Sequence, residues 1–383
     1  MRQQLTANDY SSGALIQIDV SGERVQGVRV LSDRADAAYP WVCPGFIDVQ
    51  VNGFGGFDLN AADADRHTVA GMIHALVEHG VTLCMPTVIT ASFEQMAGSL
   101  EAIRQACEAD PVVNGSIAGI HLEGPYLSPE QGFRGAHPAD QMRESNWEEL
   151  LAWQRISGGK IRMVTLAPEL PGSIPFIRSL TAHGIIASIG HSNASAADIR
   201  AAMDAGLRMG THLGNGIRAS LDRHAACVWD VLAADDLYAG FIADGHHLPA
   251  SIIHVIVGMK RSKAVLVSDA VHLAGMPPGA FTTHIGGEVE LLPSGRLQLA
   301  GNPQLLAGSA MSMADGVRHL LRLYPGRLRQ VIDTATSNPA ELLRLRDRGR
   351  IEAGGVADFV VFEMHGPDGE FAIREVWRQG RLV

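Results

Sequence analysis

Four side chains suited to metal binding or acid–base chemistry each stand at the end of a short apolar stretch of the sequence. Glu123 ends one such stretch, and His191, His212 and Asp269 end three others. One carboxylate with two imidazoles is a donor set that suits zinc or another borderline divalent metal and leaves a coordination position for water. We therefore expect Glu123, His191 and His212 to bind one metal ion, with Asp269 as the group that moves protons.

Each of these residues also has an ordinary structural interpretation. The chain has 16 histidines, and a single histidine is more often structural or exposed than a ligand. Asp269 could cap the segment that follows it. Chance is a poor explanation for the set, however, because three separate strand ends would each have to present a metal-compatible group.

The elements that must position these residues are eight short apolar runs, separated by segments with helical spacing of their apolar residues. The runs are Val42–Val51, Val81–Ile89, Ser116–Glu123, Ile161–Ala167, Gly184–Gly190, Arg208–Leu213, Leu237–Ala243 and Lys263–Ser268. The clearest helical segments are Ala64–His79, Phe93–Glu108, Ile174–His183 and Ala196–Ala205. This alternation predicts an α/β fold, a (β/α)8 TIM barrel, whose catalytic groups lie at the carboxyl ends of the strands.

The two ends of the chain differ from the middle. Ala14–Val30 and Ala357–Val383 are short extended runs interrupted by glycine, which predicts that both termini pair into a small β-sandwich beside the barrel. The predicted domains are residues 1–43 plus 346–383 for the sandwich and 44–345 for the barrel.

Two further elements are expected after the eighth strand. Phe281–Leu299 predicts a β-hairpin with its turn at Pro293-Ser294-Gly295. Met311–Leu323 and Arg327–Leu345 predict helices that complete the outer ring.

Composition excludes several classes of function. A net charge of −10 without a block of Lys or Arg argues against nucleic acid and anionic membranes as partners. No apolar run is long enough to span a membrane, and Met1–Val20 does not have the pattern of an export signal, so a cytoplasmic location is expected. The four cysteines form no C-x-x-C pair, which favours reduced thiols.

One motif in the first run identifies a family resemblance. The stretch from Pro44 to Gly53 reads PGFIDVQVNG, and it resembles the N-acetylglucosamine-6-phosphate deacetylases of the amidohydrolase superfamily. The resemblance extends from Pro44 to Asp358, with its motifs in the same order. The other motifs are Gly135–Pro138, Ile242–His247, Leu266–Ala270 and Leu306–Met311.

The first strand end bears on the number of metals. Many members of the superfamily have a His-x-His pair there that helps to hold a second metal, whereas this chain has Gln50 and Asn52. Amides are poor ligands compared with imidazole, which favours a single metal ion. Gln50 and Asn52 could also simply hold loops in place.

The resemblance implies a reaction and a role for each matching residue. It implies deacetylation of an N-acetylamino sugar 6-phosphate by one divalent metal, with zinc favoured and iron, manganese or cobalt as alternatives. Asp269 would act as general base and then general acid, and His137 would polarise the acetyl carbonyl. The residues expected along the substrate are Ala136, His137, Asn215, Gly216, Leu306, Ala307 and Gly308, with His247 and Arg223 at the phosphate. The family's phosphate-binding Arg comes from the neighbouring subunit, which implies a homodimer.

The sequence departs from the family pattern at one loop. Gly214-Asn215-Gly216-Ile217 stands where the family generally has an aromatic-Asn-Ala-Met run. The alternatives are therefore an amidohydrolase that acts on another amide or on an unphosphorylated acetamido sugar, and a non-catalytic barrel that binds a sugar phosphate.

Overall fold

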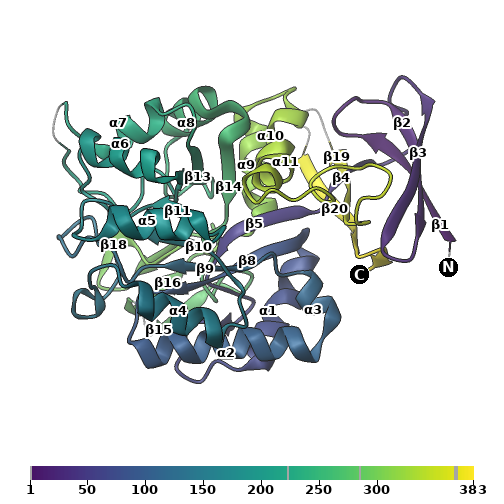
Figure 1. Cartoon of the computed structure of the whole chain (residues 1–383). Coiled ribbons are helices and arrows are strands. Elements are labelled where there is room, and N and C mark those ends of the chain that lie inside the picture. Colours follow the sequence, from purple (N-terminus) through teal and green to yellow (C-terminus); the bar gives the residue numbers. More distant parts are fainter. Residues whose placement is uncertain (1, 222–223, 284–285, 366–369) are drawn as a thin grey trace.

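The structure is a computed structural model that describes residues 2–221, 224–283, 286–365 and 370–383. Its centre is a parallel sheet of eight strands in the order β14-β13-β12-β11-β10-β9-β8-β5 (Figure 1). Hydrogen bonds between Gln50 and Asp269 and between Asn52 and Ala270 join the first strand to the last at the carboxyl ends. All eight predicted strands are confirmed, and so is the barrel. They are β5 (Phe46–Val51), β8 (Val81–Ile89), β9 (Ile120–Glu123), β10 (Ile161–Leu166), β11 (Ile186–Ile189), β12 (Leu207–Gly210), β13 (Tyr238–Ile242) and β14 (Ala264–Val267).

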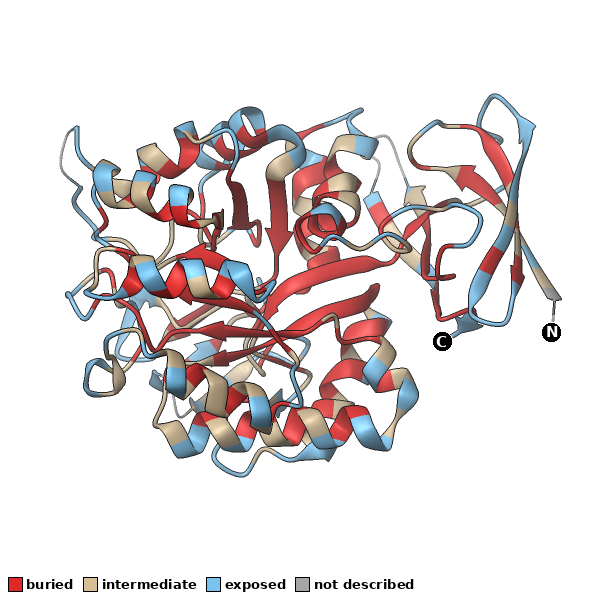
Figure 2. Ribbon diagram, viewed as in Figure 1, coloured by how far each residue is buried: buried red, intermediate tan, exposed pale blue. Residues whose placement is uncertain are grey.

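Helices surround the barrel, each with a buried inner face and an exposed outer face (Figure 2). One cluster of buried residues fills the barrel's interior, where Ile47 and Met163 pack with Leu342, the last residue of α11, and with Leu343, which follows it. In the described part of the chain, no helix has the length and apolar character to cross a membrane. The helices are α1 (Arg66–Glu78), α2 (Phe93–Ala109), α3 (Pro111–Gly115), α4 (Trp147–Ile156), α5 (Ser173–Ala182), α6 (Ala196–Ala205), α7 (Cys227–Ala233), α8 (Ala250–Lys260), α9 (Met313–Leu323), α10 (Leu328–Ala335) and α11 (Ser337–Leu342), with short 3-10 turns η1 (Ala139–Gln141) and η2 (Arg261–Lys263).

The two termini form one curled sheet, which confirms the predicted sandwich (Figure 1). A bridge between Arg24 and Val356 brings its edge strand back toward the C-terminal half, and Ile18, Val42 and Phe359 share its core. The strand order is β21-β20-β19-β4-β1-β2-β3. The strands are β1 (Arg2–Asp9), β2 (Leu15–Ser21), β3 (Arg24–Ser32), β4 (Trp41–Pro44), β19 (Phe359–His365), β20 (Glu370–Arg378) and β21 (Arg381–Leu382).

Two expected elements are divided differently in the structure. The run Val42–Val51 splits at Gly45, so that β4 belongs to the terminal sheet and β5 to the barrel. Any Cβ at Gly45 would lie 2.1 Å from the hydroxyl oxygen of Thr82, so the crossing needs glycine. The helix expected over Arg327–Leu345 breaks at Thr336, because Pro339 has no N–H and its ring would clash with the carbonyl of Ala335.

The predicted hairpin is half of a larger element. Strands β15 to β18 form a four-stranded antiparallel sheet, and the expected turn is present, with the Gly295 amide donating to the carbonyl of Leu292 at 2.9 Å. The strands are β15 (Gly279–Thr283), β16 (Gly287–Leu291), β17 (Leu297–Leu299) and β18 (Asn302–Leu306); a separate pair, β6 (Gly53–Phe54) and β7 (Phe57–Asp58), follows β5.

Candidate metal centre

The ends of four barrel strands converge at the carboxyl end of the barrel. Glu123 is the last residue of β9, whereas His191, His212 and Asp269 lie just beyond β11, β12 and β14. Each of these last three has a positive φ, of 49°, 25° and 47°. This backbone region is unfavourable for residues with side chains and is often found at functional sites.

Glu123, His191 and His212 form a buried cluster of possible metal ligands. One ligand atom from each lies within 4.8 Å of the others. The Glu123 Oε1 atom is 2.8 Å from His212 Nε2 and 3.5 Å from His191 Nε2, and the two Nε2 atoms are 3.1 Å apart. Burial alone would raise the pKa of Glu123, but hydrogen bonds from His191 and His212 hold it well below its usual range. The cluster thus offers one carboxylate and two imidazole nitrogens at a spacing that a single cation can bridge.

The orientation of His191 is fixed by its surroundings. Its Nδ1 is 2.8 Å from the carbonyl oxygen of Phe133, which can only accept, so Nδ1 carries the proton and Nε2 is left as a ligand atom. Gly216 lies against the ring, since a Cβ there would be 2.6 Å from Nδ1. Gly135 is close on the same ring, and its added Cβ would be 3.0 Å from Cε1.

Gln50 and Asn52 use their amide N–H groups as donors to the site carboxylates. Gln50 Nε2 donates to Glu123 Oε1 at 2.9 Å, and its Oε1 accepts from the Thr211 hydroxyl. Asn52 Nδ2 donates to Asp269 Oδ1 at 2.8 Å. Both amides therefore hold carboxylates in place, in agreement with the interpretation that they fix local structure.

The pKa of Asp269 is suited to the exchange of a proton near neutral pH. Burial and the nearby Glu123 carboxylate raise the pKa of Asp269 to about 6, although His212 and the bond from Asn52 act in the opposite direction. A carboxylate with this pKa is ionised at pH 7 and accepts a proton more readily than an exposed aspartate does.

His137 reaches the cluster from the loop between β9 and η1. Its Nε2 lies 4.0 Å from Glu123 Oε2, and its ring packs edge-on against that of His191, with centroids 4.4 Å apart. Burial and the neighbouring His191 lower the pKa of His137 to about 3, so its imidazole is neutral. The Nδ1 atom is 2.9 Å from the Thr90 hydroxyl, which can donate either to it or to the carbonyl of Glu123.

The residues expected along the substrate lie in segments near the carboxyl ends of the barrel strands, and they differ in their contacts with the metal cluster. Asn215 folds back on His212, with its side chain donating to the His212 carbonyl at 3.2 Å. Ala136 is exposed next to His137. Leu306, Ala307 and Gly308 lead from β18 to Ser309, which pairs with Ala270, and a Cβ on Gly308 would be 2.8 Å from Val271.

Of the two expected phosphate-binding residues, one is described. His247 Nδ1 lies 2.6 Å from Asp244 Oδ2, and the backbone N–H of His247 donates to Asp244 Oδ1 at 2.9 Å. Burial alone would raise the pKa of Asp244, yet the bonds from His247 lower it to about 2. Asp244 thus fixes the orientation of the His247 ring. Arg223 lies outside the described residues.

Sequence reasoning did not identify the supporting groups Thr90, Thr211, Asp244 and the Phe133 carbonyl. Asp244 stands three residues before His247 and could have been suspected from that spacing. Thr90 and Thr211 directly follow barrel strands, but threonine is common there and carries no distinctive signal. The carbonyl of Phe133 is a backbone atom, so no sequence pattern could reveal it.

Comparison with known proteins gives consistent results. Residues 41–383 match the sequence profile of the Amidohydrolase family. The chain is 34% identical to an N-acetylglucosamine-6-phosphate deacetylase of Bos taurus over 370 residues, which is 93% of this chain and 86% of the relative. It is also 34% identical to an N-acetylgalactosamine-6-phosphate deacetylase of a Shewanella species over 340 residues, 88% of this chain and 82% of the relative.

A solved structure shares the whole fold. It is a mutant N-acetyl-D-glucosamine-6-phosphate deacetylase of Mycobacterium smegmatis in complex with N-acetyl-D-glucosamine-6-phosphate, with a TM-score of 0.86 and 28% identity over 100% of this chain and 99% of that one.

Proposed function

The chain belongs to the amidohydrolase family, and on this premise we propose that it hydrolyses the acetamide of an N-acetylamino sugar 6-phosphate. The products are acetate and the amino sugar 6-phosphate, and N-acetylglucosamine 6-phosphate is the favoured substrate. The observation that carries the proposal is the cluster of Glu123, His191 and His212, with Asp269 at the end of β14 on the same rim of the barrel. A protein that only bound sugars would need neither a carboxylate–imidazole cluster nor a carboxylate whose pKa is about 6.

The cluster is proposed to hold one zinc ion. One carboxylate and two imidazoles suit zinc and leave a position for water, and iron, manganese or cobalt would compete according to availability. A bound divalent metal lowers the pKa of water to about 7 and acts as a Lewis acid toward a carbonyl. Gln50 and Asn52 support a single ion, because both turn N–H donors toward carboxylates.

The chain's own groups then move the proton and orient the amide. Asp269 accepts a proton from the attacking water and returns it to the leaving amine. Asn52 holds the Asp269 carboxylate by its Oδ1 atom, which leaves Oδ2 for this transfer. His137 stabilises the negative oxygen of the acetyl group by an N–H from Nε2, a tautomer that requires the Thr90 hydroxyl to donate to Nδ1.

His247 is proposed to bind the substrate's phosphate, with Arg223 supplied by a second copy of the chain. Asp244 holds His247 Nδ1, so the opposite nitrogen is free to face a ligand. A phosphate supplies binding energy away from the reacting bond, which can orient the amide over the metal. Four free cysteines and a phosphorylated substrate agree with a cytoplasmic location, as proposed from the sequence.

The direct test is acetate release by metal-loaded protein. The substrates are the 6-phosphates of N-acetylglucosamine, N-acetylgalactosamine and N-acetylmannosamine, each beside its unphosphorylated form. Turnover of a phosphorylated sugar, with kcat/KM at least tenfold above that of the same sugar without phosphate, is the expected result. Turnover of none of the six would overturn the proposed substrate class.

The proposed base predicts the pH profile. Asp269 must be ionised to accept a proton, so kcat/KM is expected to fall as the pH drops through the pKa of Asp269, which is about 6 in the structure. A metal ion next to the carboxylate favours its charged form, which places the acid limb at or below about pH 6. The measurement is kcat/KM between about pH 5 and pH 8, with metal content checked at each pH. An acid limb above pH 7 with the metal retained would contradict the assignment.

The proposed dimer agrees with an exposed apolar surface on α7 and α8. Ile252, Val255 and Met259 lie on one face of α8 with 40%, 47% and 52% of their surface exposed, and Trp229 of the neighbouring α7 is 53% exposed. In the sequence, Arg223 stands four positions before Cys227, the first residue of α7. We therefore propose this surface as part of the interface between the two subunits.

Charges on this surface are expected to separate the subunits. The variant V255E/M259E should change the mass in solution from that of a dimer to that of a monomer, because two carboxylates would have to be buried in the interface. Size-exclusion chromatography with light scattering measures this, and V28E/V30E, a matched double change on the exposed terminal sheet, serves as the control. A dimer that persists in V255E/M259E would rule out this surface as the interface.

A further inference from the structure

The residues from Ser128 to Pro138 form a loop that reaches the metal centre at two points. The carbonyl of Phe133 accepts a hydrogen bond from His191 Nδ1 at 2.8 Å, and the ring of His137 packs edge-on against the ring of His191. The loop lies between β9 and η1, and the structure describes all of it without a helix or a strand. The contacts that anchor this loop therefore decide how His191 and His137 are held.

Arg218, on the segment that follows His212, contacts the loop at three places. Its Nη2 atom donates to Glu130 Oε2, and its guanidinium carbon lies 4.9 Å from the centre of the Phe133 ring. Gly132 packs directly against it, since a Cβ added to this glycine would be 2.9 Å from Arg218 Cγ. A cation over an aromatic face is an attractive contact, so the guanidinium group holds both the carboxylate and the ring.

The Glu130 carboxylate has a second partner, from the segment that follows His191. Asn193 Nδ2 donates to Glu130 and lies 3.2 Å from each of its carboxylate oxygens. Asn193 stands two residues after His191, and Arg218 stands six residues after His212. Glu130 thus joins the loop to both segments that carry an imidazole ligand.

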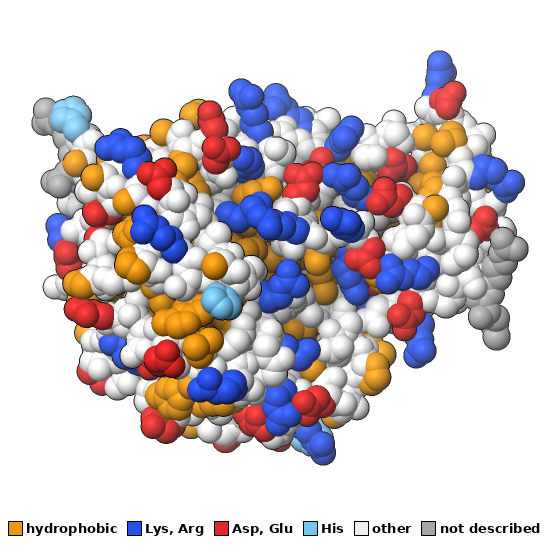
Figure 3. All heavy atoms as spheres, viewed as in Figure 1, with side chains coloured by type: hydrophobic (Ala, Val, Ile, Leu, Met, Phe, Trp, Pro, Cys, Tyr) orange, Lys and Arg blue, Asp and Glu red, His pale blue; other side chains and the backbone are white. Residues whose placement is uncertain are grey.

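The exposure of this ion pair points to a role in local geometry. The side chains of Arg218 and Glu130 are 49% and 44% exposed, and ion pairs at the surface contribute little to the free energy of folding. The Phe133 side chain beneath the guanidinium group is 4% exposed, so its position is coupled to the position of its own backbone. The carboxyl ends of the barrel strands face left in Figure 1, and on that side Figure 3 shows Lys and Arg side chains mixed with Asp and Glu.

We propose that Arg218 is a positioning residue of the metal centre. By holding Glu130 and the ring of Phe133, it keeps the Phe133 carbonyl against His191 Nδ1 and keeps His137 beside the cluster. A partner that orients the ring of a metal-binding histidine raises the affinity for the metal, and a fixed His137 is in place to meet the acetyl oxygen. The inference rests on the metal site and the reaction that are proposed above.

The test measures the zinc affinity of R218A by competition with a chromophoric chelator, together with kcat for acetate release. Loss of a group that supports a metal ligand typically lowers affinity or activity by about 10 to 100-fold. Arg218 is one contact further from the ligand, so a loss of about tenfold, the lower end of this range, is expected in both quantities. The circular dichroism spectrum of R218A should match that of the wild type, because the side chain that is removed lies at the surface.

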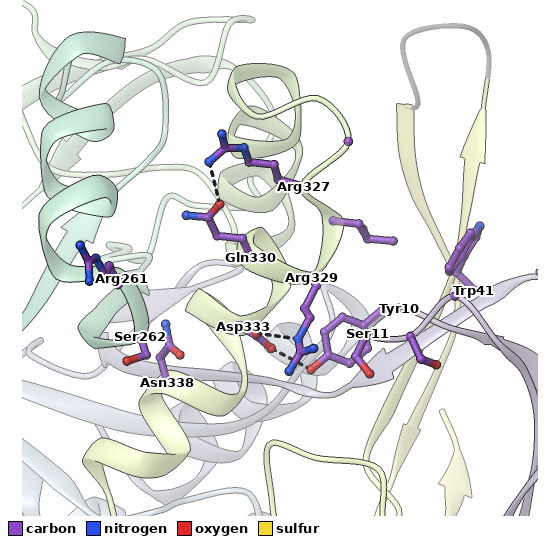
Figure 4. A pocket seen from close by; sticks show the side chains of 14 residues that line it. Tyr10, Ser11, Trp41, Arg261, Ser262, Arg327, Arg329, Gln330, Asp333 and Asn338 are labelled. Carbon is purple, nitrogen blue, oxygen red and sulfur yellow. Dashed lines mark hydrogen bonds and ion pairs between the residues drawn. The ribbon is translucent and has the colours of Figure 1, made fainter. Parts of the chain in front are cut away.

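The matched control is R329A. Arg329 lines the cavity between the terminal sheet and the barrel and pairs with Asp333 at 3.6 Å, and Asp333 also accepts the Tyr10 hydroxyl at 2.9 Å (Figure 4). Like Arg218, it is an arginine whose carboxylate partner accepts a second donor, but it lies on the side of the barrel that faces the terminal sheet. R329A should therefore keep its zinc affinity and kcat within about twofold of the wild type.

A double-mutant cycle with E130Q tests whether Arg218 acts through Glu130. The glutamine removes the charge but keeps an oxygen for Asn193, so E130Q/R218A should lose no more than R218A alone, whereas independent effects would multiply. Multiplied losses in E130Q/R218A, or a zinc affinity of R218A within about twofold of the wild type, would overturn the inference.

The zinc measurement separates this inference from the proposed reaction, because it does not need turnover. If the wild-type protein releases acetate from none of the sugars, the proposed reaction fails. The zinc affinities of R218A, R329A and E130Q/R218A still decide in that case whether Arg218 positions the metal centre.

Discussion

Replacing Asp269 with Asn is expected to lower kcat by about 10² to 10⁴-fold while the chain keeps its metal ion. General acid–base assistance typically contributes this factor, and an amide can neither accept the proton from water nor return it to the amine. The substitution preserves the shape of the side chain, and the amide oxygen of the variant can still accept the bond from Asn52 at the position of Oδ1. The loss should therefore appear in kcat far more than in KM.

The same variant tests the cause of the acid limb. If the ionisation of Asp269 produces the fall in rate near pH 6, the residual activity of D269N should no longer show it. The control is D236N, because Asp236 is almost fully exposed and pairs only with Lys263 on the surface. Activity of D269N within tenfold of the wild type would exclude Asp269 as the base.

Replacing Glu123 with Gln is expected to abolish both metal binding and turnover. The carboxylate is the one negative ligand in the cluster, and it lies between two imidazole nitrogens at 2.8 and 3.5 Å. Loss of a partner that merely supports a ligand weakens metal binding by about 10 to 100-fold, so loss of a charged ligand should exceed about 100-fold. Metal content after dialysis against a weak chelator, measured together with acetate release, checks this.

The E123Q substitution keeps the size and shape of the side chain, so that a loss of metal cannot be attributed to misfolding. Glu123 is 3% exposed and accepts a hydrogen bond from Gln50, which a glutamine oxygen can also accept, so the barrel should still fold. H191N is a second variant with the same expected loss, and H183A, at an exposed imidazole on the outer ring, should keep both metal and activity. Folded E123Q that retains one tightly bound ion per chain would contradict the ligand assignment.

Much of the barrel follows from local patterns in the sequence. Apolar runs of strand length alternate with segments of helical spacing, and a parallel sheet is the arrangement in which such units pack. Parallel strands all end at the same rim, so residues at strand ends, such as Glu123 and His212, must approach one another once the barrel closes. For this reason the sequence alone was enough to predict the barrel and to group these side chains.

Other features depend on how distant segments pack, and only the tertiary structure decided them. The loop that carries Phe133 and His137 has no periodic pattern, and its position results from contacts with His191 and Thr90. The transfer of β4 to the terminal sheet depends on its pairing with β1 and β19, which are far apart in the sequence. Sequence periodicity specifies the elements and their inner faces, whereas loops and contacts between domains depend on three-dimensional complementarity that no local pattern records.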